Sequence, residues 1–359
     1  MTLAVQIQQK WPSFALDVEF DAPPGITVLF GRSGSGKTSA ANAVAGLMRP
    51  DTGRLVLGGR ILFDTAAGIS LPPHRRRIGY VFQDARLFPH LTVRQNLTYG
   101  RWFAGRDDDI EMDRVVEMLG LAALLTRRPS ALSGGEKSRV AIGRALLSGP
   151  DLLIADEPLA ALDEPRKAEI LPYFEWLRDE TGLPILYVSH SVTEVARLAT
   201  TVVVLEAGRV IRQGDAAEVL GDPTVTPTGI RDVGALITAR LVAHHSDGLS
   251  ELDAGGIPLI LPQISGSLGR EVRLRLPAQD MILSRARPEG LSALNVIPGT
   301  IISIRDGEGP GALVVLETAA GRVLSRITRR SVAAMGLASG MTCYAIVKTV
   351  AIAAPDAGG

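Results

Sequence analysis

The sequence predicts an α/β domain built around a parallel sheet, followed by a small all-β domain. Up to about residue 225, short apolar runs alternate with helical stretches, a pattern typical of a parallel sheet with helices on both faces. A linker-like segment lies at Pro223–Gly229. Beyond it, short alternating strands are separated by Gly-rich turns and little looks helical, so a small barrel or sandwich is expected there.

The first elements of the α/β domain follow in order along the chain. Residues 1–10 alternate like a strand and lack the apolar core of a signal peptide. An apolar strand is expected at Ile26–Phe30, a helix from Thr38 to Met48 that ends before Pro50, and a hairpin over Arg54–Phe63.

The remaining α/β elements begin with a strand at Ile78–Phe82, which ends at Gln83. Thr92–Leu125 is mostly helical, and its acidic interruption at Asp107–Asp109 is a solvated loop or a helix start. Three buried-type strands separated by helical stretches come next: Leu152–Ala155, Ile185–Val188 and Val202–Leu205.

The C-terminal part has its clearest strands at Glu271–Leu276 and Leu313–Leu316. We expect the α/β domain to span residues 1–228, with a helical subdomain at about 86–148. A linker and β-rich extension is expected at 229–290, and the small all-β domain at 291–355.

Composition excludes several classes of protein. In a chain of 359 residues, Lys and Arg total 38, as do Asp and Glu, so the charge suggests no nucleic-acid partner. The single Cys343 excludes an intramolecular disulfide and suits a reducing compartment. No uninterrupted apolar run approaches the ~20 residues of a spanning helix, so another polypeptide must form any pore that the chain serves.

The first apolar strand runs directly into a Gly-rich loop: Gly31, Arg32, Ser33, Gly34, Ser35, Gly36, Lys37 and Thr38. The glycines let backbone N–H groups point at phosphates, Lys37 contributes a cation, and the Thr38 hydroxyl ligates Mg²⁺. The alternative is a Gly-rich turn that binds no ligand. The complete G-x-x-G-x-G-K-T motif, placed between a strand and a helix, argues against that alternative. The loop therefore predicts a nucleotide site.

Two further motifs carry groups suited to phosphate chemistry. Ser133, Gly134 and Gly135 open a helix, where free backbone N–H groups attract an anion. The strand from Leu152 ends in adjacent carboxylates, Asp156 and Glu157. A strand end beside the Gly-rich loop can hold Asp156 near Mg²⁺, usually through water, while Glu157 faces the attacking water.

The Gly-rich loop and the Ser133–Gly135 motif together resemble those of the ATP-binding-cassette (ABC) ATPases. In that family the second motif caps the γ-phosphate of an ATP held by the other subunit. The resemblance implies a P-loop NTPase fold, ATP and Mg²⁺ as cofactors, and a head-to-tail homodimer, since one chain's second motif should not reach its own loop. It also implies that Glu157 is the general base that polarises the attacking water.

Other ABC positions occur in order. Gln83 resembles the Q-loop residue that meets the Mg²⁺ sphere, and His190 resembles the H-loop residue that contacts the γ-phosphate. Alone, either would more often be a surface or capping residue. The resemblance implies that Mg²⁺, Lys37, backbone N–H groups and His190 stabilise charge in the transition state.

Two positions depart from the ABC pattern or leave it open. The aromatic residue that stacks on adenine should lie upstream of the Gly-rich loop, and Trp11 and Phe14 are both candidates that spacing alone does not separate. Ala160 stands where relatives often have Ser, so a hydroxyl contact across the dimer is absent there.

The segment Tyr80–Val93 resembles ABC importer ATPases, in which this region accepts a short helix of the membrane permease. Leu87, Phe88 and Pro89 are groove candidates, and plain core packing is an equal alternative for each. The resemblance implies permease subunits as partners, an external substrate-binding protein as an indirect one, and a peripheral location on the cytoplasmic face of the inner membrane.

The tail resembles the molybdate-binding Mop or TOBE domain, an OB-like barrel, in the stretches Leu291–Thr300, Arg326–Ser331 and Tyr344–Lys348. Leu294 replaces the Arg of the family's Ser-Ala-Arg-Asn motif. Four residues in these stretches are the expected donors to a tetrahedral dianion: Ser292, Thr328, Ser331 and Lys348. The alternative is that the barrel only dimerises or regulates.

Across nearly the whole chain, the resemblance is greatest to the ATPases of molybdate importers. It implies an ATP-hydrolysing subunit that energises molybdate uptake. The same enzyme could serve tungstate, sulfate or another anion, because the permease and binding protein select the cargo. An alternative from another class is a soluble, non-transport ABC ATPase or an oxyanion-sensing regulator, although the chain has one cassette and no basic recognition helix.

Overall fold

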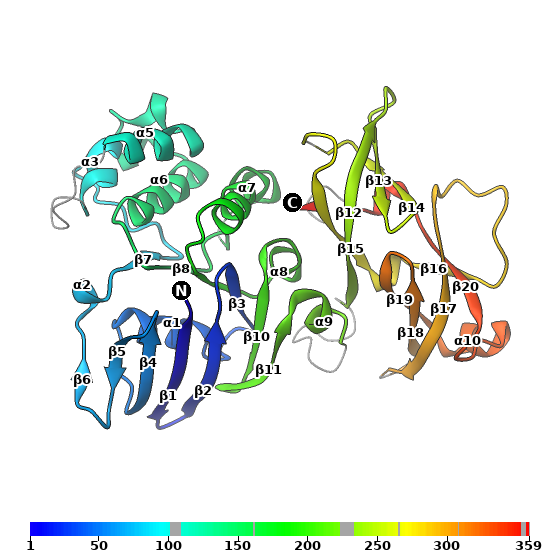
Figure 1. The fold of residues 1–359 in the computed structure, drawn as a ribbon, viewed down its shortest axis with the longest axis horizontal. Helices are drawn as coiled ribbons and strands as arrows, with labels where there is room; N and C mark the ends of the chain where they lie inside the picture. The colour runs from blue at the N-terminus through cyan, green and yellow to red at the C-terminus, as the bar shows by residue number, and fades with distance from the viewer. Residues whose placement is uncertain are drawn as a thin grey trace. The chain divides into compact units, whose positions relative to one another are not determined.

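A computed structural model describes residues 1–100, 109–160, 162–222, 233–264, 266–307, 309–352 and 357–358. The chain divides into two units: unit 1 comprises Met1–Ser191 and Leu198–Gly214, and unit 2 comprises Val192–Arg197 and Asp215–Gly359 (Figure 1). The expected linker at Pro223–Gly229, the expected boundary after residue 228, and the acidic residues Asp107 and Asp108 lie outside the described residues.

Within the described part of unit 1, eleven strands form one sheet in the order β6-β5-β4-β1-β2-β11-β10-β3-β9-β8-β7. The strands are β1 (Leu3–Trp11), β2 (Phe14–Ala22), β3 (Ile26–Phe30), β4 (Thr52–Leu57), β5 (Arg60–Asp64), β6 (Ile69–Ser70), β7 (Ile78–Val81), β8 (Leu152–Asp156), β9 (Ile185–Ser189), β10 (Thr201–Glu206) and β11 (Arg209–Asp215).

The parallel half of this sheet is the part that the apolar runs predict. β10, β3, β9, β8 and β7 pair in parallel, and every residue of β3, β8 and β9 is buried, as expected for strands covered on both faces. The other half is antiparallel, with β1 pairing β2 and β4. The predicted α/β fold is therefore confirmed.

The helices are α1 (Lys37–Ala45), α2 (Pro73–Arg76), α3 (Val93–Thr98), α5 (Asp109–Met118), α6 (Gly134–Leu146), α7 (Glu164–Glu180), α8 (Val192–Leu198), α9 (Ala216–Leu220) and α10 (Arg329–Met335). The expected extension of the first helix to Met48 is wrong, because Gly46 adopts φ 79° and its N–H bonds back to Ala43. A left-handed glycine ends a helix in this way.

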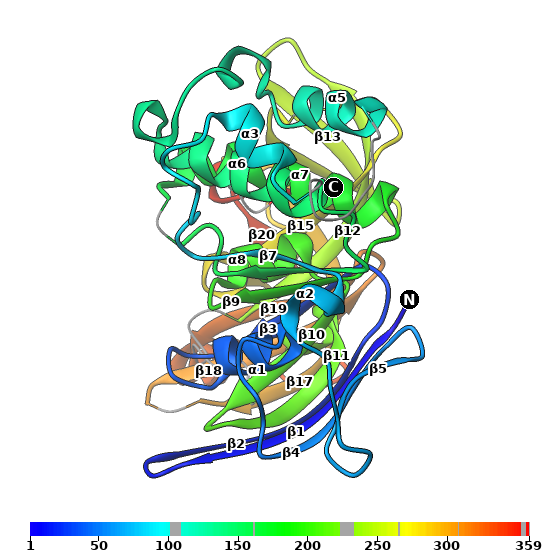
Figure 2. The same cartoon turned by 90° about the vertical axis from the view of Figure 1, so that its left-hand side faces the viewer.

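Two parts of unit 1 are relevant to the site. Figures 1 and 2 show α3, α5 and α6 grouped together and apart from α1.

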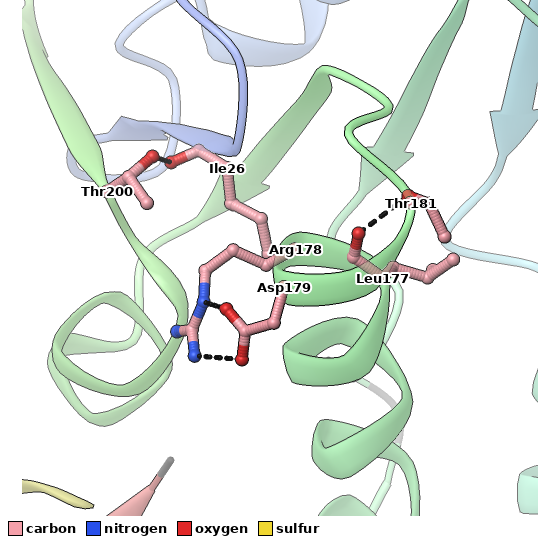
Figure 3. A network of polar contacts seen from close by, with 6 residues as sticks. All are labelled: Ile26, Leu177, Arg178, Asp179, Thr181 and Thr200. Atoms are coloured by element: carbon pink, nitrogen blue, oxygen red, sulfur yellow. Dashed lines mark hydrogen bonds and ion pairs between the residues drawn. The ribbon is translucent and has the colours of Figure 1, made fainter. Parts of the chain in front are cut away.

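Two threonine hydroxyls bond to the backbone near element ends (Figure 3). At the end of α7, the Thr181 hydroxyl donates to the Leu177 carbonyl. At the start of β3, the Thr200 hydroxyl donates to the Ile26 carbonyl. The strand that leads into the Gly-rich loop is thus held at its opposite end.

Unit 2 contains, in its described residues, two five-stranded sheets of orders β14-β13-β12-β15-β21 and β16-β20-β17-β18-β19. The strands are β12 (Gly234–His244), β13 (Leu249–Ala254), β14 (Ile257–Pro262), β15 (Glu271–Pro277), β16 (Ile282–Ser284), β17 (Asn295–Asp306), β18 (Gly311–Thr318), β19 (Gly321–Thr328), β20 (Thr342–Val347) and β21 (Ala357–Gly358). The expected β-rich tail is confirmed.

The two sheets of unit 2 share one hydrophobic core, which includes Leu259 of one sheet and Leu316 of the other. The buried amide of Asn295 reinforces the connection: its Oδ1 accepts from the Ile260 N–H and its Nδ2 donates to the Ile260 carbonyl at 2.9 Å. The described residues between 233 and 352 thus pack around a common core, and the separate boundaries expected at 229–290 and 291–355 stay a prediction.

Cys343 lies in β20, buried, with its thiol 3.1 Å from the Ser284 carbonyl. Burial raises the pKa of the Cys343 thiol, which keeps it protonated and unreactive. Among the described residues, no helix combines the length and apolar character that crossing a bilayer requires.

Candidate functional site

The Gly-rich loop between β3 and α1 needs its glycines. Gly34 and Gly36 adopt φ 81° and 102°, values that favour residues without a Cβ. At Gly31, an added Cβ would overlap the Leu205 carbonyl and lie 2.7 Å from the Ser35 hydroxyl. The sequence therefore folds here into a tight loop in which Gly31 has no space for a side chain.

The loop also presents donors that the protein itself does not use. Gly36 caps α1 with no side-chain hydrogen bond, and the first N–H groups of a helix have no intrahelical acceptor. The Ser35 hydroxyl is buried and, in the described structure, has no hydrogen-bond partner. Unused donors at a helix start form a ready anion site, so the loop fits a phosphate group.

Lys37 lies inside this loop and is only 4% exposed. Its Nζ donates to the Gly31 and Arg32 carbonyls, both at 2.9 Å. Burial lowers the pKa of Lys37, opposed by the nearby Glu157 and Asp156 carboxylates. Two neutral carbonyls compensate a buried cation incompletely, and a phosphate oxygen would be a stronger acceptor for the same ammonium group.

Asp156 ends β8 beside α1. Its Oδ1 accepts from the Thr38 hydroxyl at 2.9 Å, and burial raises the pKa of Asp156 while the hydrogen bonds from Thr38 and Tyr80 lower it. Hydroxyl and carboxylate oxygens suit Mg²⁺, which usually takes one or two carboxylates plus substrate phosphates. In the part of the chain that the structure describes, no group of three His, Cys, Asp or Glu residues could hold a metal ion by itself. The donors fit Mg²⁺ together with a nucleotide.

Glu157 and His190 follow neighbouring strands, β8 and β9. His190 Nδ1 lies 3.3 Å from Glu157 Oε1. The Glu157 backbone has φ 44°, a left-handed conformation that costs a non-glycine residue of order 1–3 kcal/mol and often occurs at functional sites. The Glu157 N–H donates to Val188 at 3.1 Å, which holds this turn against β9.

The structure thus brings five of the predicted residues to one edge of the sheet: Lys37, Thr38, Asp156, Glu157 and His190. Gln83 lies exposed just beyond the end of β7, the strand that pairs with β8. The carboxyl ends of parallel strands are where α/β proteins bind ligands, so this arrangement supports phosphate chemistry on a bound nucleotide.

Tyr80 is a site residue that the sequence reasoning missed. Its hydroxyl lies 3.1 Å from Asp156 Oδ2 and 3.0 Å from Asn42 Oδ1. Burial, followed by the Asp156 charge, raises the pKa of Tyr80, so the hydroxyl stays protonated. The available signal was its place in an apolar strand, three residues before Gln83.

The loop after Gln83 is held by two side chains that the motifs do not include. Arg144 of α6 donates to the Arg86 and Ala85 carbonyls at 2.8 and 3.0 Å. The buried Asn96 of α3 accepts from the Phe88 N–H at 2.8 Å and donates to the Phe88 carbonyl at 3.2 Å. Leu87 and Phe88 are half-buried and Pro89 is exposed, so this held loop remains accessible in part.

Ser133 caps α6 in a capping box. Its hydroxyl accepts from the Glu136 N–H at 3.3 Å, and its own N–H donates to Glu136 Oε2 at 2.6 Å, a bond that lowers the pKa of Glu136. The box leaves the N–H groups of Gly134 and Gly135 without an intrahelical acceptor. Figures 1 and 2 show α6 apart from α1, the helix that follows the Gly-rich loop.

The two candidate aromatic residues differ in their surroundings. The Phe14 ring edge would be 3.1 Å from a Cβ on Gly36 or on Gly208, so Phe14 packs beneath the loop. Trp11 is 37% exposed, and its ring centroid lies 5.8 Å from that of Phe14. Trp11 therefore has the more accessible ring.

The four oxyanion donors expected in unit 2 lie in two places. Thr328 caps α10, with its Oγ1 2.8 Å from Ser331 Oγ. Ser292 and Lys348 are exposed. Ser292 lies shortly before Asn295, the first residue of β17, and Lys348 directly follows Val347, the residue of β20 that pairs with Asn295. Thr328 pairs with Gly311 of β18, next to the end of β17. The 12-residue β17 separates the two places at about 3.3 Å per residue, so one chain does not bring all four together.

Comparison with known proteins extends these observations. A family model described as ABC transporter matches residues 16–160, and a TOBE domain model matches residues 291–354. Proteins named molybdenum import ATP-binding protein ModC are similar over almost the whole chain. The Rhizobium etli protein is 52% identical over 98% of this chain and 99% of its own length, and the Mesorhizobium japonicum protein is 49% identical over 98% and 95%.

Solved structures agree on the cassette. The protein cbiO1 of Clostridium perfringens, part of an ABC transporter complex, has a TM-score of 0.54 and 27% identity over 61% of this chain and 90% of its own. The dimeric bacterial ABC transporter cassette MJ0796 has a TM-score of 0.52 and 26% identity over 60% of this chain and 99% of its own. The chain therefore belongs to the ATP-binding proteins of ABC transporters, in the group that carries a TOBE domain and includes the molybdenum import ATP-binding proteins.

Proposed function

We propose that this chain is the ATP-hydrolysing subunit of an ABC importer that drives molybdate through a membrane permease. The observation that carries the proposal is 52% identity, over 98% of the chain, with a molybdenum import ATP-binding protein. This similarity includes unit 2, whereas similarity limited to the cassette would leave the cargo open. The absence of a spanning helix among the described residues fits a peripheral subunit at the cytoplasmic face of the inner membrane.

The Gly-rich loop would hold the phosphates of ATP. The phosphates would be surrounded by the loop backbone, from Gly31, Arg32, Ser33, Gly34, Ser35 and Gly36. Lys37 would exchange its carbonyl partners for phosphate oxygens. Thr38 and Asp156, with Gln83 at the same edge, would hold Mg²⁺, which when bound neutralises charge on the β- and γ-phosphates. Trp11 would stack on the adenine, since its ring is the more exposed of the two candidates.

Glu157 would act as the general base. It takes a proton from the water that attacks the γ-phosphorus, the bond to the β-phosphate oxygen breaks, and ADP and phosphate result. His190, whose Nδ1 is 3.3 Å from Glu157, would orient that carboxylate and contact the γ-phosphate. These two residues follow adjacent strands, so both side chains can reach the same phosphate from one edge of the sheet.

Hydrolysis would take place in a head-to-tail homodimer. Gly134 and Gly135 present unused N–H groups, and Ser133 its hydroxyl, at the start of α6, a helix that lies apart from α1 of its own chain (Figure 1). In the partner, the same motif would cap the γ-phosphate bound to this chain's loop. A related cassette has been solved as a dimer bound to ADP and Pi, which supports this assembly.

The held loop after Gln83 is the proposed contact for the permease. Leu87, Phe88 and Pro89 lie between the carbonyls that Arg144 holds, at Ala85 and Arg86, and the Leu91 carbonyl that Asn96 holds. Movement of a permease helix against this loop would reach Gln83 along the chain and α6 through Arg144. The external substrate-binding protein would act only through the permease.

Unit 2 would bind the oxyanion only where two copies meet. Within one chain, Thr328 and Ser331 lie at one end of β17, while Ser292 and Lys348 lie at the other. A complete set of four donors therefore requires a second tail. If no oxyanion binds, the tail is a dimerisation module. We also propose domain boundaries after residues 228 and 290, which separate the α/β domain, the β-rich extension and the small all-β domain.

The test is transport. The full chain and its permease are reconstituted in vesicles, and ATP-dependent uptake of molybdate is measured with tungstate and sulfate as competitors. Uptake that requires ATP and fails with Glu157→Gln supports the proposal. Uptake of sulfate in preference to molybdate would assign another anion, and full ATPase activity that no permease or anion alters would favour a non-transport ATPase.

A further inference from the structure

We propose that Tyr80 is a positioning residue for the Asp156 carboxylate, which it holds in the orientation that Mg²⁺ binding requires. The inference rests on the proposed function, because it takes Asp156 as the carboxylate of the Mg²⁺ site. It adds a residue within β7 to a site whose Mg²⁺ residues are Thr38 of the Gly-rich loop, Asp156 of β8 and Gln83 just beyond β7.

The two oxygens of Asp156 are held from opposite sides. Oδ1 accepts from the Thr38 hydroxyl at 2.9 Å, and Oδ2 lies 3.1 Å from the Tyr80 hydroxyl. Rotation about the last bond of an Asp side chain is otherwise soft. One donor on each oxygen fixes the carboxylate plane and still leaves lone pairs for a metal ion or its bound water.

The direction of the Tyr80 hydrogen bond follows from charge. The hydroxyl carries one proton, and its two neighbours at hydrogen-bond distance are Asp156 Oδ2 and the side-chain amide of Asn42. A carboxylate is the stronger acceptor, so the proton points to Asp156. With the amide turned to present its NH₂ group, Asn42 donates to the Tyr80 oxygen. The chain of contacts then joins α1, β7 and β8.

The Tyr80 ring is held independently of its hydroxyl. It stacks on Phe82 with a centroid distance of 4.2 Å and an interplanar angle of 28°, and its backbone is in register with Ile154 of β8. Tyr80→Phe should therefore keep the ring in place and remove one hydrogen bond. Loss of a residue that orients a metal ligand typically costs about 10–100-fold in metal affinity.

The experiment measures metal binding, not turnover. Mn²⁺ replaces Mg²⁺ as a spectroscopic probe, and its affinity for the full-length chain with ADP is determined by electron paramagnetic resonance. ADP affinity is measured separately in EDTA. We expect Tyr80→Phe to weaken Mn²⁺ binding about 10–100-fold and to leave metal-free ADP binding unchanged. Tyr344→Phe, which removes a tyrosine hydroxyl from β20 in unit 2, should change neither affinity.

The outcomes separate this inference from the proposed function. Equal Mn²⁺ affinity in wild type and Tyr80→Phe would overturn the role of Tyr80. If wild type binds Mn²⁺ no better than Asp156→Asn, the metal site itself is wrong. Should Tyr80→Phe lose metal-free ADP binding as well, the hydroxyl supports the fold rather than the carboxylate. Tyr80→Met, which also lacks the hydroxyl, provides a second variant, and it should reproduce the selective loss of Mn²⁺.

Discussion

Arg76 gives a stability prediction whose size follows from the structure. The residue is 2% exposed, and its guanidinium closes the C-terminal end of α1, the helix that begins at the Gly-rich loop. Nη1 donates to the Ala43 and Val44 carbonyls, both at 2.7 Å, and Nε donates to the Leu71 carbonyl at 2.8 Å. A cation at this end of the helix is also favoured by the helix dipole.

Replacing Arg76 with Met keeps much of the side-chain length and removes all three donors. Hydrogen bonds that involve a charged group contribute about 1.5–3 kcal/mol each, and buried acceptors left without a donor cost more. Part of this loss is offset, because the variant no longer removes a guanidinium from water on folding. We therefore expect the free energy of unfolding to fall by roughly 3–6 kcal/mol. For a domain of this size that is a fall in melting temperature of roughly 10–20 °C.

Thermal melting of the full-length chain, followed by circular dichroism, measures the effect. Arg75→Met is the matched control, since Arg75 is the exposed neighbour and surface changes usually stay within about 0.5 kcal/mol. Arg76→Lys should fall between them, because an ammonium group keeps the charge but loses the planar fork. ATP affinity of the folded fraction should be little changed, since Arg76 lies at the far end of α1. Equal melting temperatures for Arg76→Met and Arg75→Met would refute the reasoning.

Three further predictions concern activity and assembly. Glu157→Gln should keep ATP binding, trap an ATP-bound dimer and lower turnover about 10²–10⁴-fold; near-normal turnover in a phosphate-release assay would exclude Glu157 as the base. A mixture of Lys37→Ala and Ser133→Arg chains, each inactive alone, should recover part of the ATPase activity, because some heterodimers carry one intact site; an active monomer in size-exclusion light scattering would contradict the shared site. Lys348→Ala in the full chain should weaken molybdate binding measured by calorimetry and reduce ligand-dependent stabilisation of the dimer, and an unchanged heat would remove Lys348 from the site.

Local sequence determined the chemistry and much of the fold. The order Gly31–Thr38 after an apolar strand, the carboxylates Asp156 and Glu157 at a strand end, and Ser133 with Glu136 at a helix start are all contiguous signals. Backbone N–H groups, glycine conformations and capping depend on neighbours within a few residues. The proximity of Glu157 and His190, by contrast, depends on the pairing of β8 with β9, which the sequence analysis did not predict.

Tertiary structure alone decided which distant groups meet. Tyr80 contacts Asp156, and Arg76 contacts Ala43 and Val44. These residues are far apart in the sequence, and no periodic pattern predicts that they meet. In unit 2, Asn295 joins β17 to β14, and strand register separates Thr328 from Lys348 although both lie in family-like motifs. A motif names the residue types that suit a ligand, whereas pairing and packing of the whole chain determine the distances between them.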